Sequence, residues 1–252
     1  MAGWDSPLVR QLAAKSFAPV ESFAFDAAGR DGSDAKWRAV DVSFGEITRY
    51  RVLHEGVEWG VVETPLAGAF NVRNCLAAIA TAESLGADRD RVLEALRTYK
   101  SVRRRMEVRG VAGGVTIIDD FAHHPTAVRE TLEGTRQKYA NSRIVAVFEP
   151  RSYTAQRREF QKPYEDALSA ADEIILAGLF HPERYDADTA LRPDEMVAHW
   201  KALGRSAQYL PNVDDIVASI AANAKPGDVV LIMSNGGFGG IHDKLLGALN
   251  RA

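Results

Sequence analysis

The sequence contains a single cysteine, Cys75, in 252 residues. One cysteine excludes an internal disulfide framework and a cysteine-based zinc cluster, because both need several thiols. No apolar run approaches the about 20 residues that cross a bilayer, and the first residues lack the cationic and apolar segments of a signal peptide. Cys75 lies in the apolar run 75–80 (CLAAIA), so we interpret it as a buried structural thiol. These absences predict a protein of the reducing cytoplasm.

A large excess of one charge is also missing. The chain has 31 Lys and Arg against 34 Asp and Glu, with a formal net charge of −3. Proteins that bind nucleic acid or an acidic membrane surface normally carry a basic excess, so we expect neither partner. The composition, 46% hydrophobic and 26% charged, allows one large domain or two smaller ones.

The first part of the chain is rich in strand patterns and ends in two helical segments. Alternating apolar residues predict strands, and an alanine-rich run closed by Gly86 predicts a helix. In chain order we expect strands at 38–42, 48–53 and 59–62 and helices at 71–85 and 89–99. These elements are too few for a free-standing domain, so we interpret them as the later half of one.

The segment 100–106 (KSVRRRM) is typical of a domain boundary, and after it strands alternate with helices. We expect strands at 115–118, 143–148, 173–177 and 229–233 and helices at 125–139, 213–224 and 241–249. Such alternation predicts an α/β fold with a mostly parallel, doubly wound (Rossmann-like) sheet. Ligands of these sheets bind beyond the carboxyl ends of the strands. This rule indicates the loops after Ile118, Phe148 and Met233.

The first loop, 119–126 (DDFAHHPT), places two acids and two histidines within six residues. Carboxylates at a strand end can accept hydrogen bonds from ribose hydroxyls. Imidazoles can bind anionic oxygens or transfer protons near neutral pH. Alternatively, Pro125 simply begins a helix, and His124 or Thr126 belongs to its cap.

The second loop, 149–154 (EPRSYT), carries Arg151 directly after a strand. A guanidinium there can bind a carboxylate or phosphate through two parallel hydrogen bonds, or it can form an ordinary surface ion pair. The third loop, 234–240 (SNGGFGG), can direct backbone N–H groups at an anion, or it is only a hinge. It matches neither G-x-G-x-x-G nor G-x-x-x-x-G-K-[ST], which weakens a nicotinamide oxidoreductase as an interpretation.

Asn71 and Asn74 lie three residues apart at a predicted helix start, so both amides can face the same side. Asparagine at a helix start is most often a cap. A pair at this spacing can also bind the edge of a nucleobase.

In this order the segments resemble the Mur ligase family, which uses ATP to build the peptide of bacterial cell-wall precursors. Residues 68–74 (GAFNVRN) resemble its G-x-H/F-N-x-x-N helix start, and residues 105–107 (RME) resemble its R-x-E junction. Residues 119–126 are similar to the DD-[YF]-x-HHPT loop of the branch that acts on UDP-N-acetylmuramate. The resemblance covers nearly the whole chain, and this last motif is highly specific.

The resemblance implies a role for each matching position. Asn71 and Asn74 would lie by the adenine of ATP, and Asp120 would contact its ribose. Arg105 would reach the phosphates, and His123, near the substrate carboxylate, would join it in catalysis. The remaining substrate-binding residues would be Phe121, His124, Arg151, Ser152, His181, Arg184, Ser234, Asn235 and Gly236. ATP and Mg²⁺ would be required, with no metal ligands expected in these residues.

The sequence resembles two members of that branch, which differ in the amine that they add. The one that adds L-alanine carries P-H-R-Y-T-R, where this chain has residues 150–155 (PRSYTA), so one arginine has moved and the second is missing. A pocket with this altered charge should hold a different amine. The PRS form, with residues 233–242 (MSNGGFGGIH), resembles the member that joins L-alanyl-γ-D-glutamyl-meso-diaminopimelate to UDP-N-acetylmuramate in peptidoglycan recycling. Residues 180–184 (FHPER) would then lie near the peptide.

The chemistry implied is activation of a carboxylate by ATP to an acyl phosphate, which the amine then attacks. However, no G-x-x-G-K-[ST] loop occurs in the sequence, and the family places that loop near the start of its central domain. We therefore expect residues 1–102 to be the later half of the central ATP-binding domain and residues 103–252 to be the C-terminal domain. Such a fragment should be inactive alone. The alternative is a non-catalytic module that binds peptidoglycan fragments.

Overall fold

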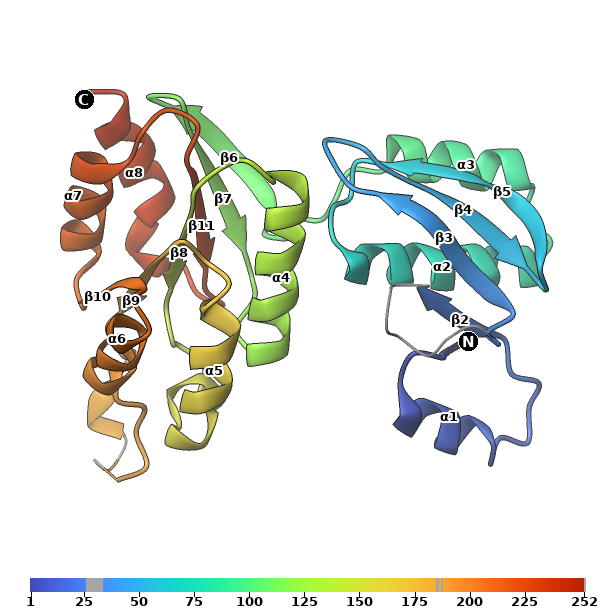
Figure 1. Ribbon diagram of the computed structural model, residues 1–252, viewed down its shortest axis with the longest axis horizontal. Helices are drawn as coiled ribbons and strands as arrows, with labels where there is room; N and C mark the ends of the chain where they lie inside the picture. The colour runs from blue at the N-terminus through green and yellow to red at the C-terminus, as the bar shows by residue number, and fades with distance from the viewer. Residues whose placement is uncertain (26–33, 185, 187, 252) are drawn as a thin grey trace. The chain divides into compact units, whose positions relative to one another are not determined.

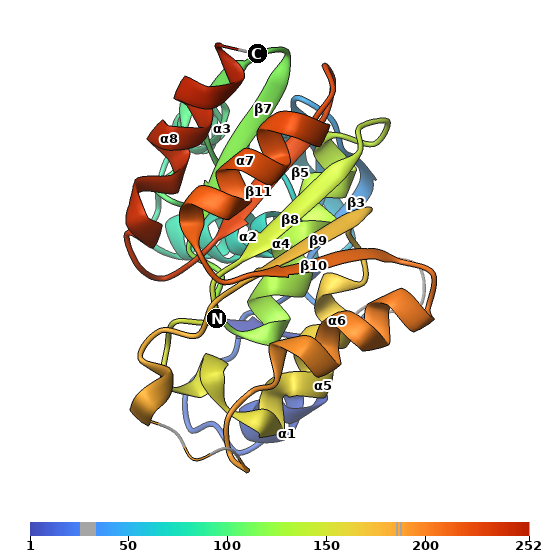
Figure 2. The same cartoon turned by 90° about the vertical axis from the view of Figure 1, so that its left-hand side faces the viewer.

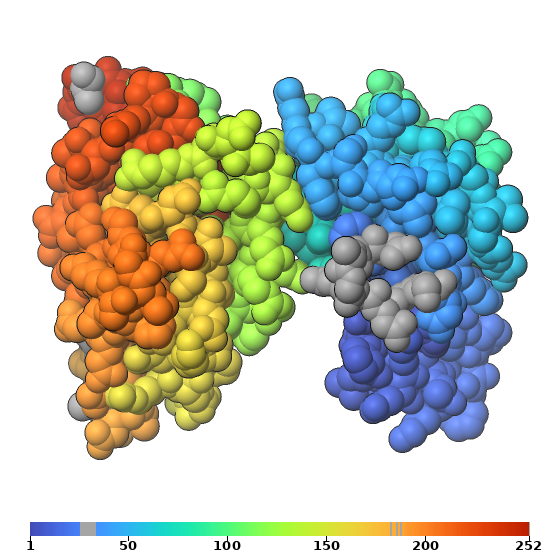
Figure 3. All heavy atoms as spheres, in the orientation of Figure 1, coloured from blue at the N-terminus to red at the C-terminus, as the bar shows by residue number. Residues whose placement is uncertain are grey.

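A computed structural model describes residues 1–25, 34–184, 186 and 188–251. The chain consists of two compact units, Met1–Ser101 and Val102–Ala252 (Figure 1). In Figure 3 the second unit, coloured from green to red, forms one closely packed body. Among the described residues, no helix is both long and apolar enough to cross a membrane.

The described part of the first unit is a five-stranded sheet with three helices. Strands β1 to β3 are parallel, and β3, β4 and β5 are antiparallel neighbours. The strands are β1 (Ala2–Gly3), β2 (Ser22–Phe25), β3 (Trp37–Ser43), β4 (Thr48–His54) and β5 (Val57–Thr64). The helices are α1 (Pro7–Ala13), α2 (Ala69–Ser84) and α3 (Arg89–Thr98). The sequence patterns predicted β3, β4, β5, α2 and α3 but missed β1, α1 and β2.

The core of this unit lies between the sheet and the pair α2 and α3. Aromatic and branched residues of the strands, such as Trp37 and Tyr50, pack against Leu76 and Ile79 of α2. The free thiol of Cys75 is buried in the same core, and burial raises its pKa. The prediction that Cys75 is buried is therefore confirmed.

The second unit contains a six-stranded sheet in the order β10-β9-β8-β11-β7-β6. All neighbours are parallel except β6 and β7, which confirms the mostly parallel sheet. The strands are β6 (Glu107–Ala112), β7 (Val115–Asp120), β8 (Ile144–Phe148), β9 (Glu173–Ala177), β10 (Ser206–Leu210) and β11 (Val229–Met233). Sequence analysis missed β6 and β10, and it ended β7 two residues early, at Ile118.

Helices cover both faces of this sheet (Figure 2). One face packs against α4 (Pro125–Lys138), α5 (Gln161–Leu168) and α6 (Pro193–Ala202), and the other against α7 (Val213–Asn223) and α8 (Ile241–Leu249). Successive side chains of a strand point to opposite faces. Ile144, Ala146 and Phe148 of β8 accordingly join the first core, whereas Val145 and Val147 join the second. The doubly wound architecture follows from this alternation.

The central strands end level with one another. In the register of the sheet, Met233 of β11 pairs with Asp120 of β7 on one side and with Phe148 of β8 on the other. Because the three strands are parallel, the loops that follow them leave from the same edge of the sheet.

Candidate functional site

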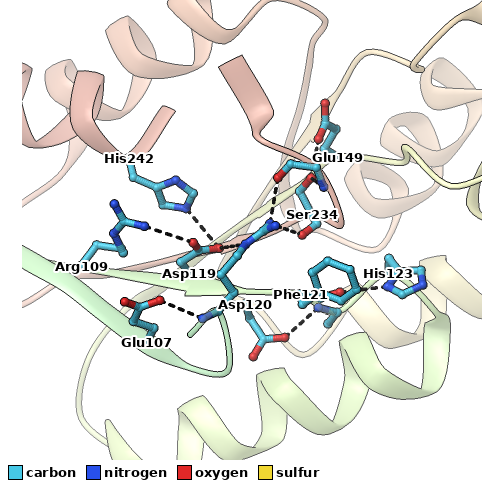
Figure 4. A network of polar contacts seen from close by, with 12 residues as sticks. Glu107, Arg109, Asp119, Asp120, Phe121, His123, Glu149, Ser234 and His242 are labelled. Carbon is cyan, nitrogen blue, oxygen red and sulfur yellow. Dashed lines mark hydrogen bonds and ion pairs between the residues drawn. The ribbon is translucent and has the colours of Figure 1, made fainter. Parts of the chain in front are cut away.

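The candidate site is this carboxyl edge of the second unit (Figure 4). We call it the rim and define it as residues 119–126, 149–152 and 234–236. Backbone hydrogen bonds join its loops: Ser234 N donates to Asp120 O over 3.1 Å, and Glu149 N donates to Met233 O over 3.0 Å. The rim is therefore a continuous structure built on three strands.

Asp119 is the centre of a buried ionic cluster beneath the rim. It is 2% exposed. Its carboxylate lies 3.4 Å from Arg104 Nε, 3.6 Å from Arg109 Nη1 and 3.4 Å from His242 Nε2. Burial opposes ionisation, but the contact and charge of His242 and the charge of Arg104 outweigh it and lower the pKa of Asp119. Asp119 is thus an ionised structural group.

Arg104 links this cluster to the glycine-rich loop. Its Nη2 atom donates to Ser234 O over 2.6 Å and to Gly236 O over 2.8 Å, so one side chain binds both ends of this short turn. The sequence analysis missed Arg104, because three consecutive arginines do not show which one turns inward. Asp119 could have indicated an inward arginine, because a carboxylate at the end of a buried strand needs a cation nearby.

Asp120 turns its carboxylate toward the protein. It accepts hydrogen bonds from Met106 N (2.8 Å), Ala122 N (2.8 Å) and Thr131 Oγ1 (3.3 Å). Burial raises its pKa, and these hydrogen bonds offset the effect only in part. Each carboxylate oxygen can accept two hydrogen bonds, so Oδ1 is fully engaged and Oδ2 has capacity for one more, on a residue that is 2% exposed.

The turn before β6 directs Arg105 outward. Arg104 and Met106, on either side of it, have left-handed backbones with φ of 59° and 48°, a conformation that is strained for residues with a side chain. Hydrogen bonds from Arg104 N to Glu107 Oε2 (2.8 Å) and from Met106 N to Asp120 hold the turn. The exposed Arg105 side chain places its guanidinium carbon 5.4 Å from the centroid of the Phe121 ring.

The two histidines of the first loop differ in their surroundings. His123 Nδ1 lies 2.9 Å from Phe121 O. A carbonyl oxygen only accepts, so this nitrogen carries the proton and Nε2 is left as an acceptor. His124 is exposed, and its Nδ1 accepts from Thr126 N over 3.4 Å at the start of α4. His124 therefore also has the capping role that was the alternative interpretation.

Arg151 lies beside a buried carboxylate and an aromatic ring. Its Nη1 is 3.6 Å from Glu149 Oε1, and its guanidinium carbon is 3.7 Å from the centroid of the Phe180 ring. Glu149, which sequence analysis did not single out, also contacts the Ser234 hydroxyl. Ser152 Oγ accepts from Ala155 N over 3.1 Å and so caps the next turn.

The glycine-rich loop is held by its own polar groups. Ser234 is 1% exposed, and its hydroxyl accepts from Gly236 N over 2.9 Å. The buried Oδ1 of Asn235 has no hydrogen-bond partner in the described part of the chain. An unpaired buried acceptor is costly, so this atom suits a donor from a ligand. Gly236 itself lies against Arg151.

The loop after β9 reaches the rim through Phe180. His181, next to it, has a left-handed backbone with φ of 56°, and its Nδ1 lies 2.9 Å from Glu183 Oε1. Arg184 ends the short turn Pro182–Arg184 and is exposed. The structure thus brings Phe180, rather than His181 or Arg184, against Arg151.

Asn71 and Asn74 lie in the first unit and contact each other. Asn71 Nδ2 donates to Ala67 O over 2.7 Å, and Asn74 Nδ2 donates to Asn71 Oδ1 over 3.4 Å. The N-cap of α2 is Gly68, with φ of 96° and no side-chain hydrogen bond. The interpretation of either asparagine as the cap is therefore wrong, and the amides share one side of the helix.

No group of three or more His, Cys, Asp or Glu in the described segments could hold a metal ion. Asp119, Asp120 and Glu149, the acids of the rim, are already engaged by arginines, by backbone N–H groups or by the Ser234 hydroxyl. The described residues therefore do not fit a resident Mg²⁺ site.

Comparison with known proteins gives one family. Residues 104–236 match the family described as "Mur ligase, glutamate ligase domain". The UDP-N-acetylmuramate–L-alanyl-γ-D-glutamyl-meso-2,6-diaminoheptandioate ligase of Escherichia coli K12 is 38% identical over 222 residues, covering 86% of this chain and 46% of that protein. The UDP-N-acetylmuramate–L-alanine ligase of Lachnospira eligens is 31% identical over 220 residues, covering 86% of this chain and 47% of that protein.

A solved structure is similar over nearly the whole chain. The murein peptide ligase of Psychrobacter arcticus aligns with a TM-score of 0.64 and 30% identity, covering 97% of this chain and 49% of that one. The chain spans about half the length of the curated relatives that it matches.

Proposed function

The chain belongs to the Mur ligase family, and from this premise we propose that it is part of an ATP-dependent ligase. The enzyme would join L-alanyl-γ-D-glutamyl-meso-diaminopimelate to UDP-N-acetylmuramate in the cytoplasm during peptidoglycan recycling. Residues 1–102 would be the later half of its central ATP-binding domain, and residues 103–252 its C-terminal domain. The convergence of loops 119–126, 149–152 and 234–236 on one rim is the observation that carries the proposal.

The proposed reaction activates a carboxylate that is otherwise a poor acyl donor. The carboxylate of UDP-N-acetylmuramate takes the γ-phosphoryl group of ATP, which gives an acyl phosphate and ADP. The peptide amine attacks the acyl carbon, the bond to phosphate breaks, and the amine gives up a proton. In the family, Mg²⁺ assists the phosphoryl transfer; its ligands would lie mainly outside these residues.

Five residues, two on the rim, one before β6 and two on α2, have matching tasks in this proposal. Arg105, exposed beside Phe121, stabilises charge on the transferring phosphoryl group. His123, whose Nε2 is an acceptor, takes the proton from the attacking amine. Asp120 accepts from the ribose, while Asn71 and Asn74 bind the adenine.

Arg151 has a specific task in the tripeptide proposal. Its side chain is 30% exposed and is positioned by Glu149 and Phe180, so it can bind a peptide carboxylate with two hydrogen bonds. Phe121, His124, Ser152, His181, Arg184, Ser234, Asn235 and Gly236 complete the proposed substrate-binding set. The L-alanine ligase is the second candidate, because L-alanine ligases also match this chain.

ADP release by the enzyme that contains this chain tests the proposal. With ATP and UDP-N-acetylmuramate, we expect kcat/KM for the tripeptide to exceed that for L-alanine by about 100-fold, because L-alanine has a single carboxylate and would leave unpaired the groups that bind the further polar groups of the tripeptide. A higher kcat/KM for L-alanine would support the second candidate, the L-alanine ligase, instead.

The 252 residues alone serve as the control in this assay. They contain no G-x-x-G-K-[ST] loop to bind the phosphates, so we expect no ADP release above background. Appreciable release would refute the proposed need for that loop. The third candidate is a non-catalytic module that binds peptidoglycan fragments. A start codon at Met1 with no in-frame G-K-T loop upstream in the DNA would favour that module.

A further inference from the structure

Arg151 is enclosed by three groups from three different segments. Glu149 lies at one end of its guanidinium, 3.6 Å from Nη1. The Phe180 ring lies under its flat face, 3.7 Å from the guanidinium carbon. Gly236 lies along its side chain. A guanidinium held on a ring face and paired at one end keeps few of the orientations that a surface arginine would explore.

The absence of a side chain at Gly236 makes this arrangement possible. A Cβ atom at this position would lie 2.6 Å from Arg151 Cζ and closer still to its Cδ and Nε atoms. Gly236 does not have the left-handed backbone that would require glycine. Its hydrogen is therefore needed for space, and the space is filled by Arg151.

The backbone of Gly236 is fixed from both sides. Its N–H donates to Ser234 Oγ over 2.9 Å, and its carbonyl accepts from Arg104 Nη2 over 2.8 Å. The loop thus cannot easily move away from an added Cβ. The flexible end of the Arg151 side chain is what would yield.

Glu149 contacts both Arg151 and the loop that carries Gly236. It is 8% exposed, and its carboxylate contacts both the Ser234 hydroxyl and the Arg151 guanidinium. One buried charge therefore fixes the loop that carries Gly236 and also attracts the arginine that fills the space.

We propose that Glu149, Phe180 and Gly236 are positioning residues that aim the Arg151 guanidinium at a carboxylate of the substrate peptide. This rests on the proposed function for the carboxylate, but the placement of Arg151 can be measured without any substrate. Glu149 and Phe180 need not touch the peptide, and Gly236 acts here through Arg151, whatever contact it makes itself. The three residues determine the direction in which the Arg151 guanidinium, the group that contacts the peptide, points.

The matched pair Gly236→Ala and Gly237→Ala tests the proposal. Gly237 has an ordinary helical backbone, with φ of −76°, and an added Cβ there meets nothing within 4 Å. Both variants should keep the melting temperature of the wild type, since the three atoms nearest to a Cβ at Gly236 all belong to the movable side chain of Arg151. Only Gly236→Ala should displace the guanidinium.

The first measurement is the proton resonance of Arg151 Nε–Hε, identified by its loss in Arg151→Lys. The Phe180 ring current should shift it in the wild type and in Gly237→Ala, and the shift should disappear in Gly236→Ala and Phe180→Leu. An unshifted resonance in the wild type would overturn the inference. A shift that persists in Gly236→Ala would also overturn the inference.

The second measurement is calorimetric titration with L-alanyl-γ-D-glutamyl-meso-diaminopimelate. Gly236→Ala should weaken binding as much as Arg151→Ala does, about tenfold or more, and Glu149→Gln should weaken it less, because an amide still bonds the Ser234 hydroxyl. Gly237→Ala should bind like the wild type. If the ring-current shift behaves as expected but wild type binds no peptide, the proposed function fails while the positioning of Arg151 stands. If wild type binds and Gly236→Ala binds equally well, the positioning role fails.

Discussion

Replacing Asp119 by alanine should lower the free energy of unfolding of the second unit by about 1 to 3 kcal/mol, because it leaves the donor groups of two half-buried arginines and of the His242 ring without their buried acceptor. Arg104, Arg109 and His242 all lie within 3.6 Å of the carboxylate. Arg104 would also lose the group that orients it toward Ser234 and Gly236. Urea unfolding followed at Trp200 checks this, since Trp200 is the one tryptophan of the second unit and is fully buried. Fluorinated Trp200 gives a separate ¹⁹F signal.

Asp243→Ala is the matched control. Asp243 also faces Arg109, at 3.7 Å, but it is 82% exposed. An exposed ion pair contributes at most about 1 kcal/mol, so this variant should unfold almost as the wild type does. Equal effects of the two substitutions would contradict the buried ionic cluster.

The contribution of Asp119 should also depend on pH. Its pKa is lowered in the folded chain, so folding favours the ionised form. This stabilisation is fully present above the unfolded-state pKa of about 3.9 and is lost as the pH falls through the folded-state pKa. The difference in stability between wild type and Asp119→Asn should therefore be largest near neutral pH and shrink below about pH 4. A difference that stays constant down to acid unfolding would exclude this account.

Arg105→Ala should lower kcat of the proposed ligase by about 100- to 1000-fold, the range seen when one donor that stabilises transition-state charge is removed. The fold should not change, because the Arg105 side chain is exposed. ADP release at saturating substrates measures the effect. KM for the peptide should change little, since the proposed contact is with the phosphoryl group.

Arg103→Ala is the control for charge alone. Arg103 is exposed, two residues away, and has the same charge. If both substitutions lower kcat by the same factor, the effect comes from the net charge of the segment. A loss smaller than about fivefold in Arg105→Ala would remove that residue from the catalytic set.

The fold of the second unit was predictable because its central strands are continuous apolar runs. Residues 229–233 are buried on both sides of the sheet, and turn residues mark the ends of the run. β6 was not predictable in this way. It is an edge strand with a bulge between Val108 and Gly110, and Val108 and Val111 are exposed, so its apolar residues do not mark a buried face.

The location of the rim was predictable, but its internal contacts were not. Parallel strands of similar length bring their carboxyl ends to one edge, so loop 119–126, loop 149–152 and loop 234–236 had to meet. The orientation of Arg104 depends on left-handed backbone conformations at Arg104 and Met106. No propensity favours that conformation in these residues. The buried Asp119 network selects it only after the strands have paired.

Glu149 shows a second limit of sequence reasoning. A glutamate next to a proline after a strand suggests an exposed loop, yet Glu149 is buried by the neighbouring strand end and by Ser234. Its partner Ser234 is 85 residues away along the chain. Contacts of this kind are determined by the register of β8 and β11, which sequence patterns do not give.

Calorimetric titration of the 252-residue chain with L-alanyl-γ-D-glutamyl-meso-diaminopimelate tests the central claim most directly, because that claim places the peptide at the rim, where Arg151 is a half-buried cation. We predict that the wild-type chain binds the tripeptide and that Arg151→Ala binds it at least about tenfold more weakly, a loss of about 1.4 kcal/mol. Equal affinity of the two chains would contradict the claim and remove Arg151 from the site.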